Sequence, residues 1–347
     1  MGDSDTATVD GTGPIPPTIE WAGDRVRLVD QRKLPETLET VEARTLEELC
    51  ALIESMAIRG APALGVAGAM GVALARLEGM PVDEAVRRLA KTRPVARDLL
   101  WGARRAASAG DPAEEAERIA REDVERNRSL AAHGMALVHD GARVLTHCNT
   151  GSLACVSYGT ALGIVRAAHE AGRRVHVWVD ETRPALQGAR LTAWELQRLG
   201  ISHEVVVDSA AGHLMASKAV DVVLVGADRV TANGDVVNKI GTYTLAVLAA
   251  HHGLPFVVAA PTSTFDPSTP TGRDVTIEHR DPTEVLTCGG RNVTPQGTRA
   301  FNPVFDVTPV SLVTAYVTEV GVWRPSELTD LMRRLTEEDF GEGAGAS

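Results

Sequence analysis

The sequence predicts an α/β protein with a mostly helical first half and a parallel sheet in the second half. Its 347 residues suggest two domains, at roughly 150 residues each. Helical patterns dominate up to about residue 138, and short β-branched runs separated by helix-length segments follow. Such alternation is typical of βαβ units, which place their strands side by side in a parallel sheet.

The first elements are a short β structure followed by helices. Residues 18–45 alternate between polar and apolar side chains and predict a short strand or hairpin. Thr45 and Glu48 have the spacing of a capping box, so a helix should run from there to about Ala57. Residues 62–78 are small and apolar, which predicts a buried, closely packed helix.

Two further helices complete the first half. Pro81 suits the first turn of a helix that reaches about Ala90, because proline needs no hydrogen bond for its nitrogen there. Asp111 is a good N-cap for a charged amphipathic helix through about Val138. We expect this last helix to bridge the two domains.

Five runs in the second half predict strands. They are Arg143–Cys148, Val175–Asp180, Glu204–Asp208, Val222–Gly226 and Phe256–Ala260. Helical segments lie between most of them, at Ser152–Ala171, Leu191–Leu199 and Gly241–His252. Polar residues follow each strand, and in open α/β sheets the ligand crevice lies at the carboxyl ends of the strands. The sequence therefore predicts one site at that edge of the sheet.

The domain boundaries follow from these patterns. We expect an N-terminal domain over residues 17–138 and a C-terminal domain over residues 139–337. The segments outside them, 1–16 and 338–347, are rich in Gly, Thr, Asp, Glu and Ala and predict flexible tails.

Composition excludes several classes of protein. The formal net charge of −11 disfavours a nucleic-acid partner, although it allows a local cationic pocket for one phosphate. No run of about 18 apolar residues predicts a membrane span, and the acidic N-terminus lacks a signal core. The four cysteines show no zinc spacing, so we expect reduced thiols in a cytoplasmic protein. Dinucleotide, P-loop and serine-hydrolase motifs are missing.

Two residues are candidates for proton transfer. Cys148 should lie at a strand end, just before a helix starting near Ser152, where the helix dipole would favour its thiolate. The alternative is a buried cysteine that packs as a small hydrophobe. Asp228 follows another strand, and an apolar crevice would raise its proton affinity and make it an acid. The alternative for Asp228 is a surface ion pair with Arg229.

Candidates for binding a phosphate come from both halves of the chain. Cations or amides stand at loop-to-helix or strand-end positions, where free N–H groups can help to hold an oxyanion. These positions are Arg59, Gly60, Ala61, Arg93, Gln187, Asn238 and Lys239. The histidines lack ligand spacing, and we interpret strand-end His147 as a hydrogen-bonded core residue.

Taken together, these segments resemble the methylthioribose-1-phosphate isomerase family over about residues 25–325. The segments that carry the resemblance are Arg59–Gly65, Leu145–Gly151, Asp180–Ala193, Gly226–Arg229, Asn238–Tyr243, Ala260–Thr264 and Asn302–Pro309. The resemblance implies a Rossmann-like C-terminal domain, a smaller, mostly helical N-terminal domain, and a homodimer.

The resemblance also implies a function. Cys148 matches the family's catalytic cysteine and Asp228 its catalytic aspartate, while the seven phosphate candidates match its substrate-binding positions. The implied reaction converts a 5-substituted ribose 1-phosphate, with methylthio first among the carbon-5 groups, into the ribulose 1-phosphate. We expect Asp228 to protonate the ring oxygen and Cys148 to move hydrogen from carbon 2 to carbon 1. This chemistry needs no metal or organic cofactor.

Three departures from the family pattern leave the carbon-5 group open. They lie at residues 95–98, at Ala185 and at His279. Alternatives are a 5-deoxy, 5-hydroxy or 5-halo substrate, or ribose 1,5-bisphosphate, for which Arg97 could supply the second cation. The same superfamily also resembles the alpha, beta and delta subunits of the exchange factor for translation initiation, so a non-catalytic regulatory subunit is the alternative from another class.

Overall fold

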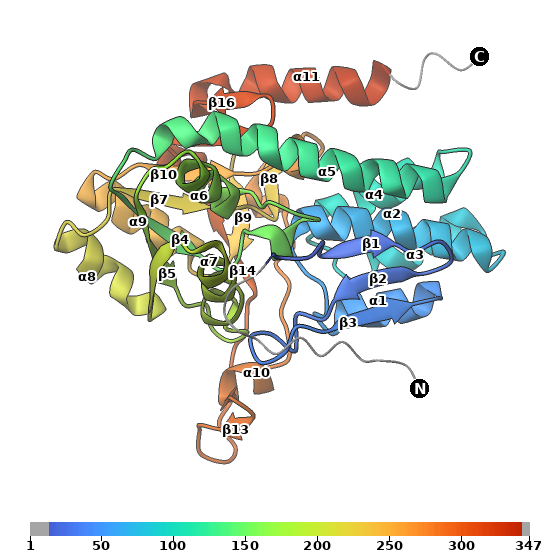
Figure 1. The fold of residues 1–347 in the computed structure, drawn as a ribbon, viewed down its shortest axis with the longest axis horizontal. Coiled ribbons are helices and arrows are strands. Elements are labelled where there is room, and N and C mark those ends of the chain that lie inside the picture. Colours follow the sequence, from blue (N-terminus) through green and yellow to red (C-terminus); the bar gives the residue numbers. More distant parts are fainter. Residues whose placement is uncertain (1–13, 342–347) are drawn as a thin grey trace.

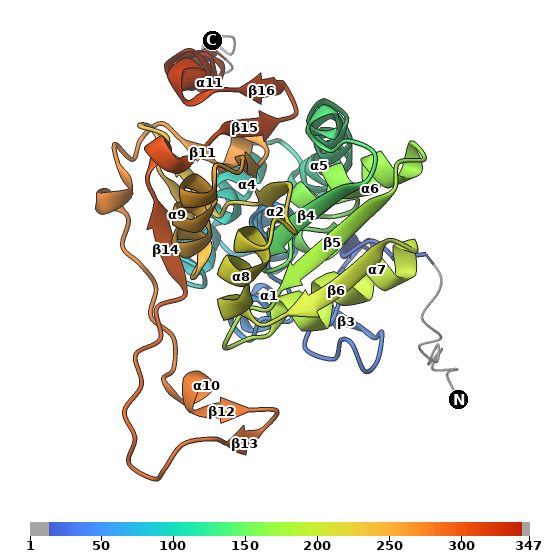
Figure 2. The same cartoon turned by 90° about the vertical axis from the view of Figure 1, so that its left-hand side faces the viewer.

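A seven-stranded sheet with helices on both faces forms the centre of the structure (Figures 1 and 2). The structure is a computed structural model that describes the backbone of residues 14–341 and the side chains of residues 14–336. The strand order is β16-β15-β10-β7-β4-β5-β6, and all neighbours are parallel except β16 with β15. The strands are β4 (Ala142–His147), β5 (Val175–Asp180), β6 (Ser202–Val206), β7 (Val222–Val225), β10 (Phe256–Ala259), β15 (Ala315–Thr318) and β16 (Gly321–Trp323). The predicted parallel sheet is therefore confirmed, with β6 beginning two residues earlier than expected.

The sheet is buried on both sides because successive residues of its central strands face opposite helical layers. Val222 and Leu224 of β7 join a core cluster with α6 and α7, whereas Val223 and Val225 join a second cluster with α8, α9 and α11. This arrangement explains the nearly continuous apolar runs of these strands. The helices are α6 (Ala161–Glu170), α7 (Ala193–Leu199), α8 (Ala211–Ala216), α9 (Thr242–His252) and α11 (Leu328–Gly341).

The helix expected over Ser152–Ala171 begins only at Ala161, so this prediction is wrong in its first half. Residues 152–154 form a single 3-10 turn. One buried carboxylate takes the Val156 N–H group, which a continuing α-helix would bond to the Ser152 carbonyl oxygen, and a second accepts from the first N–H groups of the turn. Ser152 and Leu153 donate to Glu195 at 2.6 and 3.2 Å, and Val156 donates to Asp123 at 2.7 Å. Tertiary hydrogen bonds therefore override the helical pattern at this point.

Residues before the sheet form a small antiparallel sheet packed on five helices. Its strands are β1 (Ile19–Trp21), β2 (Val26–Val29) and β3 (Thr40–Ala43). The helices are α1 (Leu46–Glu54), α2 (Ala61–Leu77), α3 (Val82–Ala90), α4 (Arg97–Ala107) and α5 (Pro112–Gly134). Both halves of the predicted capping box at Thr45 are present. Helix α4 was not expected, and α5 ends earlier than predicted and is followed by a 3-10 turn.

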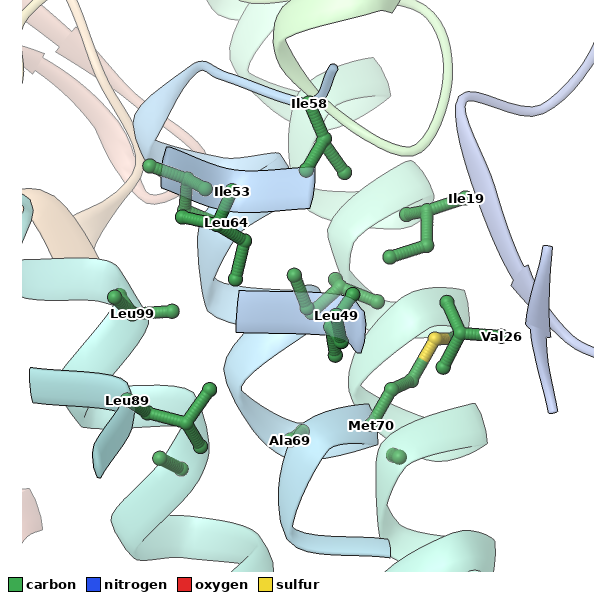
Figure 3. Close-up of a cluster of buried hydrophobic side chains, with 14 of the residues drawn as sticks. Ile19, Val26, Leu49, Ile53, Ile58, Leu64, Ala69, Met70, Leu89 and Leu99 are labelled. Atoms are coloured by element: carbon green, nitrogen blue, oxygen red, sulfur yellow. The ribbon is translucent and has the colours of Figure 1, made fainter. Parts of the chain in front are cut away.

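Helix α2 runs through the middle of this part of the chain (Figure 3). Its residues from Ala61 to Ala75 are all buried. Small residues let α4 approach closely, because a Cβ on Gly102 of α4 would lie 1.9 Å from the carbonyl oxygen of Gly65. The run of small residues thus permits backbone-to-backbone packing that larger side chains would prevent.

A four-stranded sheet and a projecting arm complete the fold. The sheet has the order β11-β8-β9-β14, with β8 (Arg229–Thr231), β9 (Val236–Lys239), β11 (Phe265–Asp266) and β14 (Phe305–Thr308). The arm projects from the body in Figure 2 and carries α10 (Thr283–Leu286), β12 (Thr287–Cys288) and β13 (Arg291–Asn292). Among the described residues, no helix combines the length and apolar character of a membrane span. Residues 1–13 and 342–347 of the expected tails lie outside the described part of the chain.

We expect Gly102→Ala to lower the stability of the protein by about 1–3 kcal/mol, the usual cost of overpacking a core. The added methyl group would collide with the Gly65 carbonyl and push α4 away from α2. Thermal unfolding followed by circular dichroism measures the effect. Gly110→Ala is the matched control, because nothing lies within 4 Å of a Cβ at that position. Equal melting temperatures for the two variants would contradict this packing argument.

Candidate active site

A cavity of about 630 Å³ lies where the N-terminus of α2 meets the carboxyl ends of β4 and β7. All nine predicted site residues line it, although they come from segments up to 180 positions apart in the chain. They are Arg59, Gly60, Ala61, Arg93, Cys148, Gln187, Asp228, Asn238 and Lys239. The structure therefore brings the thiol, the carboxyl group and the proposed phosphate ligands to one place.

The N-terminus of α2 opens onto this cavity. Gly60, Ala61 and Pro62 line the wall, and no side chain caps the first turn, so its N–H groups can receive an anion. Gly60 is needed here for two reasons. Its φ is +97°, and a Cβ would lie 2.5 Å from the backbone of Ala154. The positive N-terminal end of α2 therefore packs directly against the loop that follows β4.

Hydrogen bonds hold the Arg59 side chain against that loop and against Gln31. Its guanidinium donates to the backbone oxygen of Asn149 at 2.9 Å, to the Asn149 side-chain oxygen, and to Gln31 at 3.1 Å. The amide of Asn149 in turn donates to the buried carboxylate of Glu195 at 2.8 Å. Burial lowers the pKa of Arg59, and the nearby Cys148 and Glu195 oppose this shift. The guanidinium is therefore a fixed cation at the cavity wall.

Cys148 lies directly after β4 with a left-handed backbone, φ +61°, which is unusual for a residue with a side chain. The loop holds this conformation in place, since Thr192 donates to the Cys148 carbonyl oxygen at 2.7 Å. Such strain costs about 1–3 kcal/mol and is typical of functional sites. It turns the half-buried thiol into the cavity instead of along the strand.

The expected reason for a reactive Cys148 thiolate is wrong, because no helix begins at Ser152. Burial raises the pKa of the Cys148 thiol, and the charges of Arg59 and Lys239 oppose this effect. These two side chains, together with the backbone N–H of Asn149, therefore favour the thiolate, and the expected helix after Cys148 does not.

Asp228 faces the cavity without an ion pair to Arg229, so the alternative of a surface pair is wrong. Arg229 instead lies 3.2 Å from Asp266. Among residues 14–336, the Asp228 carboxyl group has no hydrogen-bond partner. The backbone N–H of Asp228 donates to the backbone carbonyl oxygen of Val237. Burial raises the pKa of Asp228 to about 6, against the attraction of Arg93, Arg59 and Lys239. This carboxyl group holds its proton closer to neutral pH than an ordinary aspartate does.

Lys239 is 4% exposed, yet no carboxylate of the described residues lies within ion-pairing distance of it. Burial lowers its pKa, while Cys148 and Asp228 raise it. Isolated buried charges are costly, so an unpaired ammonium at a cavity wall indicates a place for an anionic ligand. Its neighbour Asn238 is fixed by a 3.0 Å hydrogen bond from its amide to Thr242.

Arg93 and Gln187 complete the polar wall. Arg93 lies 3.6 Å from Glu278, and Gln187 accepts a 3.0 Å hydrogen bond from Thr182, which leaves its amide N–H groups for a ligand. The remaining wall is mostly apolar and escaped the sequence analysis, because such residues have no local signature of function. These residues are Met56, Pro62, Ala154, Ala227, Pro261, Val304 and Phe305.

Some other polar candidates lie away from the cavity. Asp180 accepts from His147 at 2.6 Å, which confirms His147 as a hydrogen-bonded core residue. Asp208 is exposed at the end of β6. Cys155 lies inside the predicted helix Ser152–Ala171, but in the structure it is buried directly after a 3-10 turn and is not part of a helix. Arg97 lines a different groove and contacts Ser263 and Asp266, so it supplies no second cation at this cavity.

These groups form a site for acid–base chemistry on an anion. The helix terminus and the cations of Arg59, Arg93 and Lys239 suit a phosphate. A carboxyl group with raised pKa and a thiol supported by cations line the same space, as general acid and base catalysis requires.

Removing the Lys239 charge should shift the reactivity of Cys148 to higher pH. We expect Lys239→Met to raise the pH midpoint for alkylation of Cys148 by iodoacetamide, because only the thiolate reacts and Lys239 stabilises it. The measurement uses mass spectrometry in a Cys288→Ser background, since Cys288 is exposed. Lys91→Met changes an exposed lysine outside the cavity and should leave the midpoint unchanged. An identical midpoint for both lysine variants would remove Lys239 from this role.

Comparison with known proteins identifies the family. The sequence model of the initiation factor 2 subunit family matches residues 57–325. The methylthioribose-1-phosphate isomerase of Thermosipho africanus is 48% identical over 341 residues, which cover 92% of this chain and 98% of that protein. The crystal structure of 5-methylthioribose 1-phosphate isomerase from Pyrococcus horikoshii is 39% identical, with a TM-score of 0.82 over 94% of this chain and 97% of that one.

A subunit of a translation factor is also similar. The crystal structure of translation initiation factor eIF-2B, subunit delta, from A. fulgidus is 45% identical, with a TM-score of 0.78 over 92% of this chain and 100% of that one. The family match over residues 57–325 includes every residue that lines the cavity except Met56, and the isomerase match covers 92% of the chain. The chain therefore belongs to the initiation factor 2 subunit family and, within it, to the methylthioribose-1-phosphate isomerases.

Proposed function

We propose that this chain is an aldose–ketose isomerase that converts 5-methylthioribose 1-phosphate into 5-methylthioribulose 1-phosphate. One observation carries the proposal: a single cavity holds a thiol, a proton-holding carboxyl group and a buried ammonium that has no counter-ion among residues 14–336. The names of the similar proteins support the same reaction. A sugar phosphate is the substrate class that uses all three features at once.

The substrate poses a particular chemical problem. In a ribose 1-phosphate, the phosphate ester locks the anomeric carbon, so the ring cannot open spontaneously as it does in a free sugar. The enzyme must break the bond between carbon 1 and the ring oxygen while it keeps the phosphate. A proton delivered to the ring oxygen makes that oxygen a better leaving group.

Asp228 is the proposed acid for ring opening. Its neutral form donates a proton to the ring oxygen as the bond to carbon 1 breaks, and the carboxylate that remains lies near Arg93, Arg59 and Lys239. The Cys148 thiolate removes the proton from carbon 2, and the electron pair of that bond forms a double bond between carbons 1 and 2. The product of this step is an open-chain enol phosphate.

The second half of the reaction restores both groups. The Cys148 thiol returns its proton to carbon 1, the hydroxyl proton on carbon 2 passes to the Asp228 carboxylate, and a carbonyl forms at carbon 2. Each residue ends in the protonation state in which it began, so the isomerisation is balanced without a co-reactant. The seven predicted binding residues would hold the phosphate throughout, which supplies orientation.

The two parts of the chain would enclose this chemistry. We propose that residues 17–138 form the N-terminal domain and residues 139–337 the Rossmann-like domain, with the cavity between them. Met56, Arg59 and Arg93 line it from the first, and Cys148, Asp228 and Lys239 from the second. Exclusion of water between them would strengthen the electrostatic interactions. A homodimer and a cytoplasmic location remain predictions from the resemblance and the composition, and analytical ultracentrifugation tests the first.

Loss of either catalytic group should abolish most of the activity. We expect Cys148→Ser and Asp228→Asn each to lower kcat by about 10²–10⁴-fold, the usual value of a positioned acid or base. Steady-state kinetics on folded protein measures this loss. Matched controls are Cys288→Ser and Asp208→Asn, which change an exposed thiol and an exposed carboxylate outside the cavity. Either site variant that keeps more than about a tenth of kcat would lose its assigned role.

The two pKa shifts predict a plateau in the pH profile. Catalysis needs protonated Asp228 and ionised Cys148. Below about pH 6 the acid is already protonated, so kcat/KM rises with pH as thiolate forms. Above pH 6 the gain in thiolate cancels the loss of acid until the raised pKa of the thiol is passed, and kcat/KM then falls. Initial rates across this range check the profile. A kcat/KM that does not change below pH 6 would contradict the assignment.

Substrate comparison tests the carbon-5 group. We expect the methylthio sugar to have the highest kcat/KM among 5-substituted ribose 1-phosphates, because the cavity has an apolar wall with Val304, Phe305 and Pro261. Hydroxyl, hydrogen, chlorine and phosphate at carbon 5 are the comparison set. Preference for ribose 1,5-bisphosphate would reassign the substrate, and no turnover of any sugar would favour a regulatory subunit like the A. fulgidus relative. Deuterium from solvent at carbon 1 of the product separates proton transfer from a direct hydride shift.

A further inference from the structure

A second, larger cavity adjoins the candidate active site. Its volume is about 920 Å³, and Met56, Arg59 and Gln187 line both this cavity and the first one. Because the same three side chains face both spaces, they separate the outer cavity from the site that contains Cys148. The proposed chemistry uses none of the other residues of this outer cavity.

Four segments far apart in the sequence form its walls. Three of them belong to the body of the protein and contribute Gln31 and Arg32, then Ser55, Met56 and Arg59, and then residues 183–187, Arg190 and Leu191. The fourth is the start of the arm, from Arg280 to Gly289. The arm projects from the body in Figure 2, and Arg183 of the body donates to the backbone of Val285 and Thr287 on the arm, so the outer cavity is lined by residues of both.

The charges of this outer cavity differ sharply from those of the whole chain. Five arginines and one glutamate line it, whereas the chain as a whole carries a formal charge of −11. The arginines are Arg32, Arg59, Arg183, Arg190 and Arg280, and the glutamate is Glu284. An anion that approaches the protein is therefore repelled by most of the surface and attracted here.

Two of these arginines form no direct ion pair within the described residues, although Glu181 acts on both and Glu36 on Arg190 at longer range. Arg183 donates to the carbonyl oxygens of Val285 and Thr287 at 3.0 and 2.9 Å, and Arg190 donates to those of Gln31 and Leu34 at 2.7 and 2.8 Å. Within residues 14–336, no carboxylate lies at ion-pairing distance from either guanidinium. Carbonyl oxygens fix the position of a guanidinium but do not neutralise it, so both remain sources of positive potential.

The other two cations near the opening are paired. Arg32 lies 2.7 Å from Asp30, and Arg280 lies 2.7 Å from Glu284. Neither arginine contacts the proposed catalytic groups, and Arg32 keeps a side-chain exposure of 41%. Changing these two residues therefore alters the charge of the outer cavity without removing a group that lines the candidate active site, although Arg280 neutralises Glu284, whose charge acts on Lys239.

We propose that this outer cavity is the entrance to the active site and that its arginines gather phosphate-bearing sugars at the opening before they pass Met56 and Gln187. The substrate class rests on the function proposed above, whereas the path and its charge do not. A cleft lined by one sign of charge can raise association rates by about 10–10³-fold, and salt weakens the effect. The outer cavity thus attracts a phosphate dianion locally, although the negative net charge of the whole protein repels it.

Alkylation of Cys148 tests the path without any enzymatic turnover. Iodoacetate carries a negative charge and iodoacetamide is neutral, and with both reagents the thiolate sulfur displaces iodide to form a thioether. The ratio of their rates cancels the thiolate fraction and reports the potential along the path. Mass spectrometry in a Cys288→Ser background follows Cys148, because the exposed Cys288 lines the outer cavity.

The decisive variant is Arg32→Gln with Arg280→Gln. We expect the rate ratio of iodoacetate to iodoacetamide to fall by roughly threefold or more at low ionic strength, and to approach the parent value near 1 M salt, where the Debye length is about 3 Å. Arg32→Lys with Arg280→Lys should restore the ratio, which separates charge from packing. Arg121→Gln, on the exposed face of α5 and outside both cavities, is the control and should leave it unchanged.

Each outcome decides the proposal. An unchanged ratio in the glutamine double variant, or a fall that persists at high salt, would overturn it. If the ratio behaves as expected but no sugar phosphate turns over, the entrance stands and the proposed function fails. Where turnover is found, kcat/KM of the glutamine double variant should depend less steeply on salt than that of the parent, with kcat unchanged. Equal salt dependence would overturn the role of the entrance in substrate capture.

Discussion

The contact between the N-terminus of α2 and the loop after β4 is the constraint on which the rest of the site depends. Gly60 brings the helix backbone against Ala154, and the adjacent Arg59 guanidinium donates to both oxygens of Asn149. Asn149 is held in turn by the buried Glu195 carboxylate. This contact joins residues that begin near position 60 to a loop near position 150, and the cavity exists because both meet there. It also fixes the backbone next to Cys148, whose left-handed conformation directs the thiol into the cavity.

Electrostatics in this cavity is a competition between burial and fixed cations. Burial disfavours the charged form of every titratable group, so it raises the pKa of both Cys148 and Asp228 and lowers that of Lys239. Arg59 and Lys239 act in the opposite direction on both acids. The result is a carboxyl group that keeps its proton to about pH 6 and a thiol whose ionised form depends on its neighbours. A phosphate dianion would meet the same cations, so binding of the substrate and the protonation of the two acids are linked.

Much of the fold could be predicted, because its signals are local. The capping box at Thr45 and the buried run of α2 depend on residues a few positions apart, and the structure confirms both. The failure over the first half of the predicted helix Ser152–Ala171 has the opposite cause. The Val156 N–H group bonds to Asp123, which lies far away in sequence, in place of the Ser152 carbonyl oxygen, and no local pattern shows that competition. Strands β8 and β9 pair with each other across a turn at Asn233 and Gly234, which is a local hairpin signal that the sequence analysis overlooked because both strands are short.

The sequence by itself determined which residue types stand at strand ends and at the start of α2. The resemblance selected nine of these residues as site candidates, and all nine line one cavity. Only the tertiary structure decided the electrostatics of that cavity. The support for the Cys148 thiolate comes from Arg59, Lys239 and the backbone N–H of Asn149, not from a following helix, and the entrance takes its charge from residues 32, 183, 190 and 280. The physical reason is that hydrogen-bond patterns and periodicity act over a few residues, whereas desolvation and Coulomb interactions depend on distance in space, which chain folding alone sets.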